Sequence, residues 1–80
     1  LVALQALLRD GSVTRAAARL HRTQPAVSAA LARGRALFGD PLLVRAGARM
    51  VLTERARALA PRIDAALAGV AALVEPEGFD

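Results

Sequence analysis

The sequence predicts a mostly α-helical domain, and three features of the chain lead to this expectation. Two short amphipathic segments, residues 14–20 and 24–37, are separated by a tight turn. A later segment that starts near residue 54 repeats apolar residues at spacings of three and four. Between these parts, two four-residue stretches flank a glycine, which is typical of a short β-hairpin. Together these elements fill the single domain that 80 residues can form.

The first helix is expected over residues 1–9, where leucines recur at spacings of three and four. Gly11 follows it and can adopt the left-handed conformation that commonly ends a helix. Ser12 or Thr14 would cap the second helix, which is expected to end at Leu20. The inward stripe predicted for the first helix is Leu1, Leu4, Leu7 and Leu8.

The turn between the second and third helices is predicted at His21-Arg22. Thr23 can act as the N-cap of the third helix by accepting a hydrogen bond from a free backbone N–H. Pro25 then falls in the first turn, where its missing N–H costs nothing. The third helix is therefore expected over residues 24–37. The side chains expected to pack these two helices together are Ala17, Leu20 and Val27.

A short two-stranded hairpin is expected after the third helix. Gly39-Asp40-Pro41 stops that helix, because glycine favours a helix end and proline cannot continue one. The strands are predicted at residues 42–45 and 49–52, on either side of Ala46-Gly47-Ala48. Gly47 can take the positive φ angle that the tip of a hairpin requires.

A final helix is expected to follow Thr53 as its cap, with Glu54 at its positive end. Pro61 lies inside this pattern and removes the hydrogen bond to the carbonyl of Arg57, which predicts a kink or a boundary near Ala60. The apolar stripe along the helix either covers its own domain or needs a partner. The stripe consists of Leu59, Ile63, Ala66, Leu67, Val70, Leu73 and Val74.

The charge of the chain favours a polyanionic partner. The formal net charge is +4, and all 11 basic residues are arginines. Residues 11–53 hold seven arginines against Asp40 alone, residues 54–80 are net acidic, and Arg9 offsets Asp10. The basic surface therefore belongs to the short helices and the hairpin, although a scattered, solvated set of arginines is the alternative interpretation.

Several classes of function are disfavoured by the residues present. His21 is the single histidine, and no carboxylate pair or phosphate-binding glycine loop suggests an enzyme with a catalytic site. The absence of cysteine excludes a disulfide framework and a Cys-type zinc site, and neither a metal nor a cofactor is expected. Two phenylalanines as the only aromatic residues suit single-stranded nucleic acid poorly. The uncharged run at residues 65–74 is too short to span a bilayer, so the expectation is a soluble, cytoplasmic protein.

Several motifs occur in a fixed order and spacing along almost the whole chain. They are Gly11-Ser12-Val13-Thr14, Ala16-Ala17, Leu20, Thr23-Gln24-Pro25-Ala26-Val27-Ser28, Phe38-Gly39-Asp40-Pro41-Leu42-Leu43-Val44-Arg45, Met50-Val51-Leu52-Thr53 and Arg55-Ala56. This set resembles the N-terminal winged helix-turn-helix domain of LysR-type bacterial transcriptional regulators. The resemblance implies a three-helix core with a two-stranded wing at residues 1–53 and a linker helix at residues 54–75. Residues 76–80 would begin a hinge to an effector-binding domain that this chain lacks.

The resemblance also implies sequence-specific binding to double-stranded DNA, with residues 24–37 as the recognition helix in the major groove. Glutamine can make a bidentate contact to adenine, and the apolar surface of proline and alanine can meet a thymine methyl group. The base-reading candidates are Gln24, Pro25, Ala26 and Ser28. Hydroxyls at helix N-termini suit phosphate, as do arginines on the recognition helix and the wing. The phosphate-contact candidates are Thr14, Thr23, Arg33, Arg35, Arg45 and Arg49.

By the same resemblance, the regulator is a homodimer that places one recognition helix on each half of an interrupted palindrome. The linker helix would pair with its copy, and a small-molecule effector would bind only the separate C-terminal domain. Such a regulator would work at the nucleoid in the cytoplasm, without a membrane. The alternative function is a helical dimerisation or protein-interaction module without specific DNA binding. The dimerisation candidates are Leu59, Ile63, Leu67, Val70 and Val74.

Two positions depart from the pattern of the family. The position after Ser28 often carries a long polar side chain, but here it is Ala29, which reduces direct base readout. A leucine is usual where this chain has Gly34. Glycine costs about 1 kcal/mol relative to alanine inside a helix, so we expect a soft or bent second half of the recognition helix. On this basis Gly34→Leu is expected to raise the melting temperature.

Overall fold

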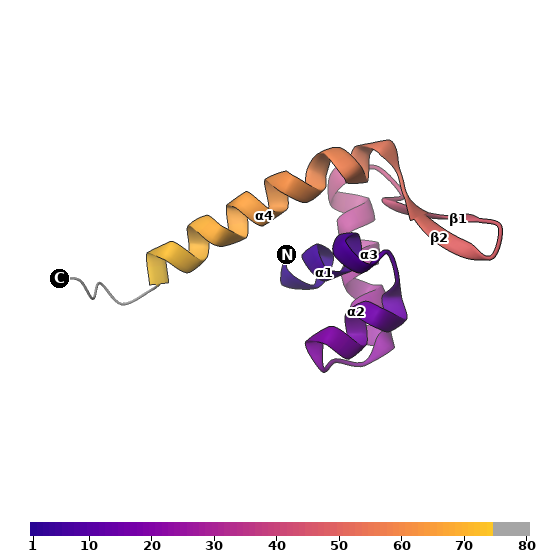
Figure 1. Ribbon diagram of the computed structural model, residues 1–80, viewed down its shortest axis with the longest axis horizontal. Coiled ribbons are helices and arrows are strands. Elements are labelled where there is room, and N and C mark those ends of the chain that lie inside the picture. The colour runs from indigo at the N-terminus through magenta and orange to yellow at the C-terminus, as the bar shows by residue number, and fades with distance from the viewer. Residues whose placement is uncertain (75–80) are drawn as a thin grey trace.

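The computed structural model describes residues 1–74 and contains four helices and a two-stranded antiparallel sheet. The elements are α1 (Val2–Asp10), α2 (Val13–Leu20), α3 (Gln24–Phe38), β1 (Leu43–Ala46), β2 (Arg49–Leu52) and α4 (Glu54–Val74). Figure 1 shows α1, α2 and α3 clustered together, while the β1–β2 hairpin and α4 extend from the cluster in different directions. The predicted winged helix-turn-helix with a long final helix is therefore confirmed. The hinge expected at residues 76–80 lies outside the described residues.

The polar residues expected to start the helices do so. Ser12 Oγ accepts a hydrogen bond from the Arg15 N–H at 3.1 Å, which caps α2. Thr23 Oγ1 accepts from the Ala26 N–H at 3.2 Å, and Thr53 Oγ1 accepts a similar bond at 3.0 Å where α4 begins. Each cap satisfies a backbone N–H that has no partner within its own helix. These three helix starts are therefore encoded locally.

The tight turn between α2 and α3 also lies where it is predicted. His21 adopts a φ angle of 54°, which is uncommon for a residue with a side chain. The Arg22 N–H closes the turn by donating to the Ala17 carbonyl at 3.0 Å. The turn is compact enough that α2 and α3 pack directly against each other.

A single apolar core joins the first three helices, the start of the hairpin and the first half of α4. Of the three residues predicted to pack α2 against α3, Ala17 and Val27 are buried and Leu20 is partly buried. The predicted inward position of Leu1 is wrong, because this residue precedes α1 and is 60% exposed. The other three leucines of that stripe are buried. The buried apolar residues are Leu4, Ala6, Leu7, Leu8, Ala16, Ala17, Val27, Leu31, Leu42, Leu43, Ala56, Leu59 and Ile63.

The hairpin pairs β1 with β2 so that Leu43 faces Leu52, and its tip contains Gly47 with a φ angle of 66°. Strand β2 has the predicted bounds. Strand β1 begins one residue later than predicted, because Leu42 has a φ angle of 66°, which lies outside the range of a strand. The side chain of Leu42 is fully buried in the core instead.

Gly34 lies in a tightly packed part of α3. A Cβ atom at this position would be 3.1 Å and 3.3 Å from the two δ carbons of Leu4, and 3.3 Å from Leu42 Cδ1. The expectation that this helix lacks a core side chain is therefore wrong, since its neighbours already occupy the space that a leucine would need. Helix α3 also continues without interruption as far as Phe38.

Helix α4 is continuous through Pro61, so the helix boundary expected next to this proline is not present. Leu59 and Ile63, on either side of the proline, are both buried in the core. Gln5 Nε2 also donates to Asp64 Oδ1 at 2.8 Å, which fastens α1 to α4 just beyond the proline. Tertiary contacts therefore hold the helix across the backbone hydrogen bond that proline cannot make.

The apolar stripe of α4 divides into two parts. Leu59 and Ile63 belong to the core of this domain, and Leu67 packs partly against that core. Beyond this point the side chains of Val70 and Val74 are 54% and 77% exposed. The interpretation that the stripe covers its own domain therefore holds for its first half. In the described part of the chain, nothing covers its second half.

Candidate nucleic-acid interface

The four predicted base-reading residues lie together at an accessible helix end. Gln24, Pro25, Ala26 and Ser28 stand in the first turns of α3 and are all exposed. Val27, which interrupts them in the sequence, is fully buried and fixes this end of the helix against the core. The structure therefore leaves all four side chains accessible near the start of α3, and base reading by them stays a prediction.

Thr14 and Thr23 occupy the starts of the two helices that form the motif. Thr14 is exposed in the first turn of α2, and Thr23 is the exposed N-cap of α3. The start of a helix presents free backbone N–H groups that suit an anion. Both hydroxyls therefore lie where they can add a hydrogen bond to a phosphate oxygen.

A groove of about 530 Å³ lies between the α1–α2 connection and the hairpin. Five arginines line it, one from each of α1, α2, β1, β2 and α4. We call this feature the arginine groove. Its arginines are Arg9, Arg15, Arg45, Arg49 and Arg57, and Asp10 is the single carboxylate among the described residues that line it.

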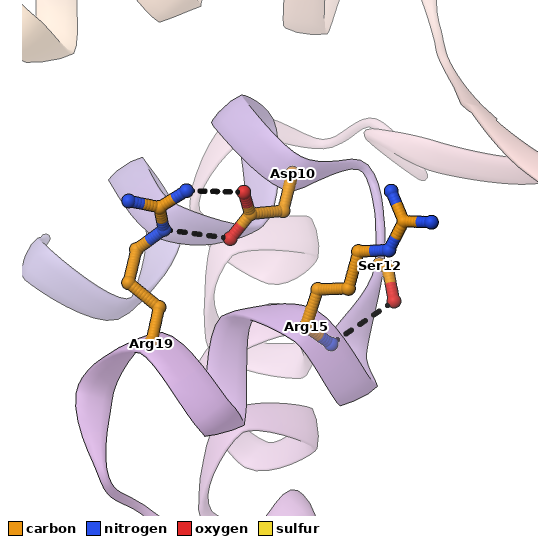
Figure 2. Close-up of polar contacts among 4 residues, drawn as sticks. All are labelled: Asp10, Ser12, Arg15 and Arg19. Carbon is orange, nitrogen blue, oxygen red and sulfur yellow. Dashed lines mark hydrogen bonds and ion pairs between the residues drawn. The ribbon is translucent and has the colours of Figure 1, made fainter.

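Asp10 forms its ion pair with Arg19, which lies outside the groove, and it acts on Arg9 and Arg15 only through weaker long-range attraction. Figure 2 shows the two side chains side by side, with Arg19 Nε and Nη2 donating to the carboxylate at 2.9 Å and 2.8 Å. These hydrogen bonds hold the pKa of Asp10 below its usual value. Arg9 and Asp10 offset each other only in the formal charge sum, since the structural partner of Asp10 is Arg19 of α2.

The five arginines of the groove have no anionic partner within residues 1–74, where none of their side chains takes part in a hydrogen bond or ion pair. Figure 2 shows the Arg15 side chain directed away from the Asp10–Arg19 pair, with its backbone N–H bonded to Ser12. Like charges around a concave surface focus a positive potential. The groove is therefore suited to a chain of anions.

Sequence reasoning missed Arg9, Arg15 and Arg57 as members of this site. They join Arg45 and Arg49 only through the fold, because no local spacing connects five separate elements. The one signal available in the sequence was their charge, which they share with every other arginine of the chain.

Arg33 and Arg35 lie close together in α3 but have different surroundings. Arg33 is exposed. Arg35 Nε donates to the Pro41 carbonyl at 2.7 Å, and Arg35 Nη2 donates to the Leu43 carbonyl at 3.0 Å. Arg35 is therefore engaged at the base of the hairpin, which leaves only its other N–H groups for the predicted phosphate contact.

Asp40 holds the same base of the hairpin through its carboxylate. Its Oδ2 accepts hydrogen bonds from Thr53 Oγ1 at 2.7 Å and from the Leu42 N–H at 2.9 Å. These bonds, the one from Thr53 foremost, hold the pKa of Asp40 below its usual value. The residues that precede β1 and those that follow β2 are thereby tied to each other.

No group of three or more His, Asp or Glu side chains in residues 1–74 is arranged to hold a metal ion. No helix in the same range combines the length and the apolar character needed to cross a bilayer.

Known proteins share this arrangement of helices and hairpin. The sequence pattern of the family described as "Bacterial regulatory helix-turn-helix protein, lysR family" matches residues 1–57. The chain belongs to the LysR family. The matched range runs from α1 through the hairpin into the first turn of α4, so it includes every element of the predicted winged helix-turn-helix.

Curated relatives of this LysR-family chain include two rhizobial proteins. "Nodulation protein D 1" of Rhizobium meliloti (strain 1021) is 49% identical over 67 residues, which is 84% of this chain and 22% of that protein. "HTH-type transcriptional regulator SyrM 1" of Sinorhizobium fredii (strain NBRC 101917 / NGR234) is 44% identical over 80 residues, which is 100% of this chain and 23% of that protein. The chain thus spans less than a quarter of the length of these two relatives.

Solved structures agree with this LysR-family assignment. A probable transcriptional regulator from Pseudomonas aeruginosa superposes with a TM-score of 0.82 at 38% identity, covering 92% of this chain and 25% of that chain. A LysR-family transcriptional regulator from Eggerthella lenta gives a TM-score of 0.72 at 30% identity, covering 79% of this chain and 90% of that chain. Both the predicted fold and the predicted membership of the LysR family are therefore confirmed, and this membership favours a DNA-binding regulator over a helical interaction module.

Proposed function

We propose that this LysR-family domain binds double-stranded DNA sequence-specifically, as a homodimer on an interrupted palindrome. The observation that carries the proposal is the arginine groove, whose five positive charges lack an anionic partner in the described chain. The DNA backbone supplies a regular chain of anions, and a protruding helix such as α3 fits the major groove.

In this proposal the exposed start of α3 reads the bases. Gln24 makes a bidentate contact to adenine, Pro25 and Ala26 meet a thymine methyl group, and Ser28 bonds to a base or a phosphate. The methyl group of Ala29 offers no hydrogen bond, so specificity depends on few direct contacts together with the shape of the duplex.

Phosphate contacts come from both helix starts and from arginines. Thr14 and Thr23 act with the free N–H groups of α2 and α3, and Arg33 lies further along the recognition helix. The arginine groove receives an adjacent stretch of backbone, and Arg45 or Arg49 on the wing enters the minor groove.

The homodimer forms through the second half of α4. Val70 and Val74 are the exposed apolar side chains that support this assignment, and Leu67 lies at its inner edge. Leu59 and Ile63 act indirectly, because they are buried in the core and hold the helix in place. Residues 1–53 form the DNA-binding unit, and α4 (Glu54–Val74) represents the linker helix expected at residues 54–75, the last of which lies outside the described residues.

The larger protein is proposed to be a cytoplasmic, nucleoid-bound regulator without enzymatic activity. A small-molecule effector binds a domain outside this chain. The domain described here therefore binds DNA without responding to a ligand.

In vitro selection of bound duplexes from a random pool tests the proposed function. Two inverted half-sites at a fixed spacing are expected, and affinity for them should fall steeply as salt rises, because each neutralised phosphate releases counterions. Failure to enrich any sequence, or an affinity that does not change with salt, would overturn the proposal. A domain that dimerises, but whose affinity for DNA does not change with salt, would support the alternative function of a helical protein-interaction module.

Gln24→Ala is expected to weaken binding to the selected duplex by about 1–3 kcal/mol, because a bidentate base contact is lost. Binding to a random duplex should change little, since that mode depends on phosphates. Fluorescence anisotropy titrations with both duplexes measure the difference. Equal losses on the two duplexes would contradict a base-reading role for Gln24.

Arg57→Gln is expected to weaken binding to selected and random duplexes alike, and to reduce the salt slope by about one phosphate contact. Arg57 lines the arginine groove, whereas Arg62, exposed on the same helix, does not. Arg62→Gln is therefore the charge-matched control. Identical salt slopes for the two variants would exclude the groove from the interface.

A further inference from the structure

The chain between α3 and the hairpin makes a strained turn. The Leu43 N–H donates to the Pro41 carbonyl at 2.7 Å across a single residue, Leu42, whose φ angle is 66°. This is a γ-turn with a positive φ, a rare conformation for a residue with a side chain. The Leu42 side chain is fully buried, which holds the residue in place. Backbone strain of this kind persists where the surrounding contacts over-determine it.

Arg35 binds both ends of this turn. Its Nε donates to the Pro41 carbonyl at 2.7 Å, and its Nη2 donates to the Leu43 carbonyl at 3.0 Å. The carbonyl of Arg35 also accepts from the Asp40 N–H at 3.3 Å, at the end of α3. The planar guanidinium fork fixes the directions of both side-chain donors. The angle at which β1 leaves α3 therefore depends on this residue, together with the hydrogen bonds of Asp40 to Leu42 and Thr53.

The two arginines of the hairpin lie on the strands that this turn directs. Arg45 faces Met50 and Arg49 faces Ala46 across the two-stranded sheet. Each strand has four residues and one neighbouring strand, so within residues 1–74 the sheet contains no third strand that could set its direction. The placement of both arginines relative to α3 therefore follows from the base of the hairpin and from the packing of Leu43, Met50 and Leu52 on the core.

We propose that Arg35 is a positioning residue for DNA binding, which sets the orientation of the hairpin and thereby the places of Arg45 and Arg49 on the duplex. This inference rests on the proposed function. It differs from the direct phosphate contact predicted from the sequence, because Arg35 acts through geometry and not through its charge. Lysine keeps the charge but lacks the two-pronged fork, so it does not replace arginine here.

A double-mutant cycle tests this role. Arg35→Lys is made alone and in the Arg45→Gln/Arg49→Gln background, and binding to the selected duplex is titrated at several salt concentrations. Alone, Arg35→Lys is expected to weaken binding about tenfold and to flatten the salt slope by up to about two phosphate contacts. In the background without wing arginines, its further effect should be below about twofold. Arg62 is exposed and lies outside the groove, so the control variant Arg62→Lys should bind the selected duplex with the affinity and salt slope of the wild-type protein.

A direct phosphate contact gives the opposite pattern. Arg35→Lys would then bind almost as the wild-type protein does, and the losses from Arg35→Gln and from the wing pair would add. Either result overturns the positioning role while leaving the proposed function standing. A wild-type domain that prefers no sequence would refute the proposed function itself.

A structural readout separates positioning from loss of the fold. Amide chemical shifts of the Arg35→Lys variant are expected to change at residues 42–52 while those of α1, α2 and α3 remain near their wild-type values. Circular dichroism at the same temperature establishes that the variant is folded. A hairpin spectrum identical to the wild-type spectrum, or a variant that is unfolded throughout, overturns the proposal.

Discussion

The Val70→Glu/Val74→Glu variant is expected to be a monomer that binds the selected palindrome at least about 10²-fold more weakly than the wild-type domain. Both valines are more than half exposed, at 54% and 77%, on the half of α4 that extends beyond the core. Within a helix pair, each glutamate would be buried without a counter-ion. Loss of the pair removes the gain in affinity that comes from linking two half-site contacts.

The matched control for this prediction is Ala68→Glu/Ala72→Glu. At about 3.6 residues per turn, these alanines lie on the opposite face of α4 from the valines, and the variant carries the same charge at the same spacing. Analytical ultracentrifugation gives the oligomeric state, and titrations on one and on two half-sites give the affinities. A stable dimer of the valine variant, or equal behaviour of the two variants, would contradict the proposed linker-helix pair.

Gly34→Leu is expected to lower the free energy of unfolding by about 3 kcal/mol, the opposite of the increase that the family pattern suggests. A Cβ atom alone would already lie 3.1 Å from Leu4 Cδ1 and 3.3 Å from Leu42 Cδ1. Leucine adds three further carbons to this closed space, so the core must move or the side chain must leave its preferred rotamers. In a domain of this size, such a loss is a large part of the total stability.

Two alanine variants separate packing from helix propensity. Alanine is better than glycine by about 1 kcal/mol inside a helix, and a Cβ atom at Gly69 would meet nothing within 4 Å. Gly69→Ala is therefore expected to raise the melting temperature, and Gly34→Ala to gain less because of Leu4 and Leu42. Thermal and urea unfolding, followed by circular dichroism, measure all three variants. A higher melting temperature for Gly34→Leu would show that the core accepts the larger side chain.

Much of the fold can be read from the sequence because local residues determine it. Thr23 caps α3 and Thr53 caps α4 through hydrogen bonds that span three residues. Signals of this range place the helix starts and the hairpin to within a residue of their observed positions. The one-residue shift of β1 has a non-local cause, because the conformation of Leu42 depends on its burial in the core and on the Thr53 N–H, which donates to its carbonyl.

The rest depends on contacts between segments that are far apart in the chain. Asp10 pairs with Arg19 and not with the adjacent Arg9, because the turn after α1 brings α2 alongside it. Arg57 lines the arginine groove although it belongs to the final helix. The space beside Gly34 is occupied by the side chains of Leu4, in α1, and Leu42, in the connection before β1. The periodicity of apolar residues identifies the apolar face of α4. It does not indicate which part of that face is buried against the core of the same domain and which part is exposed.

The first half of α4 is fixed in the core, so a small rotation there would displace the exposed end of the helix. Leu59 and Ile63 are embedded in the core and Asp64 is bonded to Gln5, so this half of the helix is held rigidly against the three-helix core. The 21 residues of α4 span about 30 Å. The ten residues beyond Asp64 form a free arm of about 15 Å, so a tilt of about 10° at its base would displace the far end by about 3 Å, close to the ~3.4 Å rise of one base pair. In the proposed dimer, core packing around these two buried side chains would therefore help to set the distance between the two half-sites.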